Sequence, residues 1–111
     1  MSSINLNTLK VSDPGDGKAI PVTSVNMVCN MTSAGAETRT LAIPKFVGQT
    51  CALCCDTYVG NIVVTAASGI NVAANTVMTF GAVDEAIFLE AVTKAGALRW
   101  QVVANDGVAL S

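Results

Sequence analysis

Apolar and polar residues alternate along much of this chain, and the alternation predicts β-strands. In residues 24–31 apolar side chains occupy every second position, at Val25, Met27, Cys29 and Met31. Val28 is the one apolar residue outside this alternation. Successive side chains of a strand point to opposite faces, so a period of two indicates a strand with one buried face. We therefore predict a half-buried strand over residues 24–31.

Six further segments of similar pattern are separated by turns that contain glycine or asparagine, and we predict a strand in each: 39–43, 50–56, 62–65, 76–80, 86–92 and 98–103. The composition of residues 82–91 also tolerates a helix, but Gly81 and residues 93–96 bracket the segment like the ends of a hairpin strand. The pattern as a whole predicts an all-β fold, an antiparallel sandwich or barrel of about seven or eight short strands.

The first 23 residues differ from the rest. Residues 13–17, Asp-Pro-Gly-Asp-Gly, form a turn cluster, and Pro21 disfavours a regular central strand. We predict an extended N-terminal arm over residues 1–23, followed by a β-rich domain over residues 24–111. A frayed terminus is the alternative. If the arm tethers the chain to a neighbouring subunit or a larger body, its apolar side chains make the contact: Leu6, Leu9, Val11, Ile20 and Val22.

The composition favours assembly. Hydrophobic residues make up 51% of the 111 residues and charged residues only 13%, about half the usual share in a soluble domain. A solitary molecule would expose much apolar surface, so we expect a homo-oligomer or a subunit lying on a larger body. We expect no membrane insertion, because no apolar run approaches the roughly 18 residues of a spanning segment. The N-terminal residues lack a secretory pattern, which predicts synthesis in a cytoplasm.

Charge and aromatic content argue against nucleic-acid binding. Six basic and eight acidic residues give a net charge of -2, and the basic residues form no cluster. Aromatic residues are only 5% of the chain, too few for base-stacking platforms. We predict that the aromatic side chains fill the core: Phe46, Tyr58, Phe80, Phe88 and Trp100.

Candidate catalytic groups are scarce. The chain contains no histidine, the commonest general base and the usual partner of a nucleophilic serine or cysteine. Asp84 and Glu85 are adjacent, and Glu90 and Asp106 can approach in space, but neighbours on one strand point to opposite faces. We therefore predict that the protein is not an enzyme and needs no cofactor.

The four cysteines are the remaining candidates for chemistry: Cys29, Cys51, Cys54 and Cys55. Four thiolates can hold a structural zinc ion, and Cys51 and Cys54 have the two-residue spacer of many such sites. In a strand, however, Cys51 and Cys55 share one face and Cys54 lies on the other, which separates the ligands. We predict buried thiols, with a disulfide from Cys29 and a metal site as the alternatives.

Several segments resemble small structural proteins of tailed bacteriophages. The resemblance lies in residues 38–44 (TRTLAIP), 48–50 (GQT), 75–80 (NTVMTF) and 99–102 (RWQV), within a stretch that covers residues 38–111. Phage proteins of this type are β-rich and serve as head decoration (cement) proteins or as pieces of head and tail fibres. The resemblance implies a trimeric or dimeric β-sandwich or barrel on a capsid lattice, without catalytic residues.

The predicted function is therefore capsid decoration: a homo-oligomer, a trimer rather than a dimer, that binds the outside of the major capsid protein lattice and stabilises the head. The predicted location is the capsid surface of the virion. The alternative is a fibre segment or receptor-binding β module, for which Trp100 and Tyr58 would be the contact residues.

Overall fold

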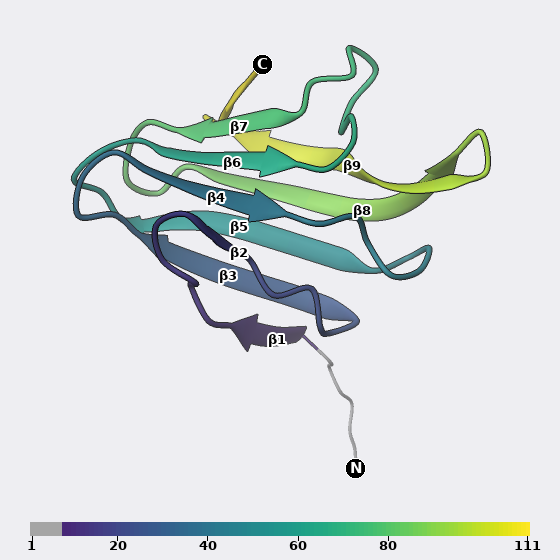
Figure 1. Cartoon of the computed structure of the whole chain (residues 1–111), viewed down its shortest axis with the longest axis horizontal. Coiled ribbons are helices and arrows are strands. Elements are labelled where there is room, and N and C mark those ends of the chain that lie inside the picture. Colours follow the sequence, from purple (N-terminus) through teal and green to yellow (C-terminus); the bar gives the residue numbers. More distant parts are fainter. Residues whose placement is uncertain (1–7) are drawn as a thin grey trace.

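The computed structural model describes residues 8–111, and in this range it contains ten strands and no helix (Figure 1). The strands form two mixed sheets of five strands each. Their bounds are β1 Thr8–Val11, β2 Lys18–Ala19, β3 Asn26–Thr32, β4 Glu37–Leu41, β5 Thr50–Thr57, β6 Ile62–Ala66, β7 Val77–Phe80, β8 Ala86–Lys94, β9 Ala97–Asp106 and β10 Ala109–Leu110. The prediction of an all-β fold is confirmed for this part of the chain, and β3 to β9 correspond to the seven predicted strands. Within the same residues no helix is long and apolar enough to cross a membrane.

Parallel and antiparallel pairs occur in both sheets. Sheet A has the order β1-β3-β5-β8-β9, with β1, β3 and β5 parallel and β8 and β9 antiparallel to their neighbours. Sheet B has the order β10-β7-β6-β4-β2, with β2, β4 and β6 parallel and β7 and β10 antiparallel. The sheets do not close into a barrel, because each ends in an edge strand on both sides.

The prediction of a purely antiparallel fold is wrong, and the path of the chain explains why. From β3 to β6 the chain changes sheet after every strand, so β3 and β5 belong to sheet A and β4 and β6 to sheet B. Strands that are neighbours in a sheet are then two apart in the sequence and run the same way, joined by a crossover through the other sheet. The antiparallel pairs β6–β7 and β8–β9 join strands that follow one another in the chain.

The prediction of an extended arm needs correction for its described part, residues 8–23. β1 pairs with β3, and β2 pairs with β4, so this segment adds an edge strand to each sheet. Val11, Ile20 and Val22 are buried in the hydrophobic core of the same chain, and Leu9 is 56% exposed. Leu6 lies outside the described residues. Pairing within the chain therefore occupies one side of each of these edge strands, and burial removes Val11, Ile20 and Val22 from contact with a neighbour.

The core consists of apolar side chains from both sheets, which join one hydrophobic cluster. β5 shows how the alternation builds it, because Cys51, Leu53 and Cys55 are fully buried while the residues between them are half-buried. Burial of a leucine side chain such as that of Leu53 contributes about 1.5–3 kcal/mol relative to an exposed one.

The aromatic residues divide between core and surface. Phe80 and Trp100 are buried as predicted, and Tyr58 packs against the core while half-buried. The prediction is wrong for Phe88 and Phe46, which are 39% and 43% exposed. Phe88 lies between the inward-pointing Ile87 and Leu89 of β8, so it points outward.

Candidate interaction surface

The outward face of sheet A carries a row of paired residues that crosses all five strands. The register aligns Lys10 with Val28, Val28 with Ala52, Ala52 with Phe88, and Phe88 with Ala104. We call this side of the sheet the outer face. Four of these five positions are apolar, although their side chains point away from the core.

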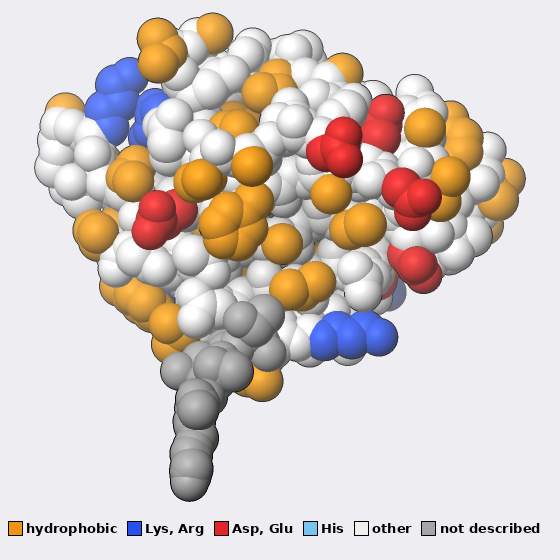
Figure 2. All heavy atoms as spheres, turned by 180° about the vertical axis from the view of Figure 1, so that it is seen from behind, with side chains coloured by type: hydrophobic (Ala, Val, Ile, Leu, Met, Phe, Trp, Pro, Cys, Tyr) orange, Lys and Arg blue, Asp and Glu red, His pale blue; other side chains and the backbone are white. Residues whose placement is uncertain are grey.

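A shallow hollow lies in this apolar row. Its volume is about 240 Å³, and Phe88 and Ala104 contribute to its walls together with Ala52, Ala86, Ile87, Asn105 and Asp106. Val103 lies near this hollow at an irregularity in the β8–β9 register and is 56% exposed. Figure 2 views the molecule from the side of sheet A and shows apolar side chains spread across the middle of the face. Exposed apolar area of this kind marks contact surfaces in soluble proteins.

Charged side chains lie at opposite ends of β8. At its N-terminal end, the backbone of Asp84 and Glu85 bonds to that of Cys55, which places the acidic residues of neighbouring strands together: Asp56, Asp84, Glu85 and Asp106. We call these four residues the acidic group. At the other end, β8 reaches Lys94 and a two-residue turn, in which Ala95 and Gly96 both have positive φ. Figure 2 shows acidic side chains mainly on the right and basic ones at the upper left, while acidic atoms also appear on the left and basic atoms at the lower right.

Arg99 lies at the basic end and is 9% exposed. Its Nη2 donates to the carbonyl oxygen of Asn71 at 3.4 Å and to the side-chain oxygen of Gln101. Its Nε is buried without a hydrogen-bond partner, and no carboxylate of residues 8–111 forms an ion pair with it. Beside it is a hollow of about 250 Å³, which we call the Arg99 pocket, lined by Ser68, Gly69, Ala74, Lys94, Ala97, Leu98 and Arg99.

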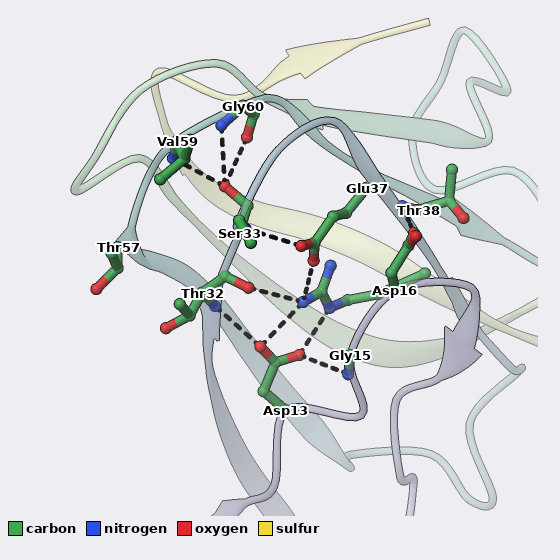
Figure 3. A network of polar contacts seen from close by, with 12 residues as sticks. Asp13, Gly15, Asp16, Thr32, Ser33, Glu37, Thr38, Thr57, Val59 and Gly60 are labelled. Carbon is green, nitrogen blue, oxygen red and sulfur yellow. Dashed lines mark hydrogen bonds and ion pairs between the residues drawn. The ribbon is translucent and has the colours of Figure 1, made fainter.

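Arg39 forms the second buried cationic centre, and it forms ion pairs within the chain with Asp13 and Glu37, which are labelled in Figure 3. Its Nε and Nη2 donate to the two carboxylate oxygens of Asp13 at 2.7 and 3.0 Å, a bidentate pair. Nη2 also lies 3.1 Å from Glu37 and donates to the carbonyl oxygen of Thr32 at 3.0 Å. This network fastens the turn that follows β1 to strands β3 and β4.

The pKa values of this pair follow from burial and hydrogen bonding. Burial opposes the charged form of Asp13, but hydrogen bonds from Arg39, Thr32 and Gly15 outweigh it and lower the pKa of the carboxyl group. Burial likewise opposes the charged form of Arg39, and the two carboxylates outweigh it and raise the pKa of the guanidinium. The ion pair is therefore maintained at neutral pH.

The polar contacts continue from β3 to the turn after β5. Ser33 is buried, and its hydroxyl donates to the carbonyl oxygen of Gly60 at 2.7 Å and accepts from the backbone N–H groups of Val59 and Gly60 (Figure 3). A side chain at position 60 would come within 2.4 Å of the backbone of Gly35. Only glycine allows the two turns to approach this closely.

The cysteines are free thiols, as predicted, and three of them are buried: Cys29, Cys51 and Cys55. Cys54 is half-buried and points to the opposite side of β5, the arrangement that the alternation predicted. Burial raises the pKa of Cys29 to about 11 and that of Cys51 to about 12. Among residues 8–111 no three cysteine or carboxylate side chains are grouped so that they could hold a metal ion.

The candidate carboxylates take structural or surface positions. Glu85 accepts a hydrogen bond from the backbone N–H of Gly81 at 2.6 Å, and Asp84, Glu90 and Asp106 are exposed. Glu90 faces Gln101 across the β8–β9 pair, on the outer face. Of the two hollows described above, only the one on the outer face is lined by a carboxylate, that of Asp106.

The burial of Arg39 and Arg99 was not predicted from the sequence. A signal existed for Arg39, which alternates with Leu41 in β4 and therefore shares its inward face. The partner Asp13 is 26 residues away in a turn cluster, and no local pattern links the two. No local pattern predicts the burial of Arg99, because the residues that cover it belong to a distant loop, residues 68–74.

Comparison with models of known protein families and with curated proteins produced no match to this chain.

Proposed function

We propose that the protein is a bacteriophage capsid decoration protein, which binds the outside of the major capsid protein lattice as a homo-oligomer, a trimer rather than a dimer, and stabilises the head. In this proposal the two sheets pack face to face as a β-sandwich, and the outer face of sheet A lies against the capsid or a neighbouring subunit. The protein has no enzymatic role and acts on the virion surface after synthesis in the host cytoplasm.

The observation that carries the proposal is the apolar row across the outer face. Val28, Ala52, Phe88 and Ala104 align on four neighbouring strands, and Phe88 remains 39% exposed. The molecule measures 39 × 38 × 23 Å, so a broad face exceeds the roughly 800 Å² per partner of a standard interface. Apolar burial of about 25 cal/mol per Å² then stabilises the contact, and repetition over a lattice adds avidity.

The alternative, a receptor-binding module of a fibre, needs exposed aromatic side chains around a groove. Trp100 is 2% exposed, and its indole N–H donates to the carbonyl oxygen of Ala42 at 2.8 Å. The hydroxyl of Tyr58 donates to Asn61. Trp100 is therefore unavailable for a ligand, and the outer face supports decoration better than glycan recognition.

Cosedimentation with particles of the phage whose genome encodes the chain tests this proposal. Phe88→Asp places a charge in the middle of the outer face and is expected to abolish binding to the particles. Thr65→Asp is the matched control, because Thr65 is exposed on β6 of sheet B. Equal binding of the two variants and the unchanged protein would exclude the outer face as the contact. Absence of binding by the unchanged protein would exclude decoration.

A further inference from the structure

The Arg99 pocket contains a cation that the chain does not neutralise. Arg99 as a whole residue is 9% exposed, its Nε is buried without a hydrogen-bond partner, and its guanidinium forms no ion pair within residues 8–111. Residues 1–7 include no aspartate or glutamate. Arginine is almost never buried without a partner, because removal of its charge from water is costly. The charge of Arg99 is therefore available to an anion from outside the chain.

The pocket walls indicate which kind of anion fits. Ala74, Ala97 and Leu98 supply apolar surface, and Lys94 supplies a second positive charge at the rim. A carboxylate on a short aliphatic stem suits this combination, since the methylene groups pack on the apolar wall while the oxygens meet the guanidinium. A free hydrated phosphate would leave the apolar wall unfilled.

The same molecule presents such carboxylates at the other end of the sheet. Asp56, Asp84 and Asp106 of the acidic group are exposed, and Glu85 is half-buried. β8 runs from this end to Lys94 over eight residue steps, a distance of about 27 Å at roughly 3.4 Å per residue. The two charged ends are therefore too far apart to pair within one molecule.

We infer that the Arg99 pocket binds a carboxylate of the acidic group of a second copy of this chain. Complementary ends on one subunit allow copies to associate with the basic end of one against the acidic end of the next. This inference rests on the homo-oligomer that the proposed function assumes, and it names the contact that builds it. Binding to the capsid through the outer face is a separate property.

Sedimentation velocity over a range of protein concentrations tests the contact. The unchanged protein is expected to associate, and Arg99→Met to associate at least about tenfold more weakly, because a buried charge pair is lost. The combined variant Asp56→Asn, Asp84→Asn, Asp106→Asn should show the same loss with Arg99 intact. Lys18→Met is the control, because it removes one charge from an exposed position of β2 in sheet B.

Mixing the two defective variants gives the sharpest result. Each retains the end that the other lacks, so an equimolar mixture should associate more strongly than either variant alone. Normal association of both variants, no gain on mixing, or a monomeric unchanged protein would overturn the inference. Stoichiometric binding of acetate or phosphate to a monomer, measured by calorimetry and lost in Arg99→Met, would also overturn it. A monomer that still cosediments with particles would leave the decoration function standing.

Discussion

Arg39 and Arg99 are both buried on strands, but they differ in where the opposing charge comes from. Arg39 has two carboxylates of its own chain within 3.1 Å, whereas Arg99 has only a carbonyl oxygen and an amide oxygen. Each leaves one buried nitrogen without a hydrogen-bond partner. The difference separates a cation that stabilises the fold from one that is available to an external anion.

Of the substitutions considered, removal of Asp13 should lower the free energy of unfolding the most. Asp13→Ala leaves Arg39 with a single carboxylate in a buried site, and breaking a buried pair in this way costs about 3–5 kcal/mol of unfolding free energy. Denaturant unfolding measures the loss. Asp16→Ala in the same turn is the control, because exposed Asp16 accepts one bond from the backbone of Thr38 at 2.9 Å, worth about 0.5–1.5 kcal/mol. Similar losses for both variants would show that the ion pair contributes little.

Acid should remove part of the same stabilisation. The pKa of Asp13 is lowered in the folded protein, so its contribution is present above the unfolded value of about 3.9 and is lost as the pH falls through the lower folded value. Unfolding free energies of the unchanged protein and Asp13→Asn between pH 2 and 6 measure this. The difference between the two should narrow below about pH 4. A constant difference over the whole range would contradict the assignment.

Arg99→Met should change the stability of the monomer by no more than about 1 kcal/mol. The substitution removes a charge that has no carboxylate partner, and an apolar replacement of a buried ion is often neutral or stabilising. Arg39→Met should lower the stability more, because it leaves Asp13 and Glu37 without their cation. Thermal unfolding at a concentration below association measures both variants. A loss of 3 kcal/mol or more in Arg99→Met would falsify the view that its charge is unsatisfied in the monomer.

Lys94→Met should have the smallest effect. Lys94 is exposed at the rim of the Arg99 pocket. The free energy of unfolding of the variant should therefore stay within about 0.5 kcal/mol of that of the unchanged protein. Association should weaken less than in Arg99→Met and should depend less on salt, because exposed charges are screened. Sedimentation at low and high sodium chloride measures both properties. Stronger weakening than in Arg99→Met would assign the main charge contact to the rim.

The alternation of side chains predicted β3 to β9 because it is a local property of a strand. It also placed Cys51 and Cys55 on the buried face and Cys54 on the other. It failed for Phe88, where aromatic character suggested burial although its neighbours Ile87 and Leu89 already occupy the inward positions. Within a regular strand, the alternation of inward and outward positions is thus a better guide to burial than the residue type.

The sequence by itself determined the strands, their inward and outward faces and the low content of charged residues. Each of these depends on neighbouring residues or on composition. Only the tertiary structure decided that the sheets are mixed, that residues 8–23 pair with both sheets of their own chain, that Asp13 neutralises Arg39 and that Arg99 lacks a carboxylate. Strand direction and ion pairing depend on which distant segments meet. A pair such as Asp13 and Arg39, 26 residues apart, leaves no trace in the local pattern.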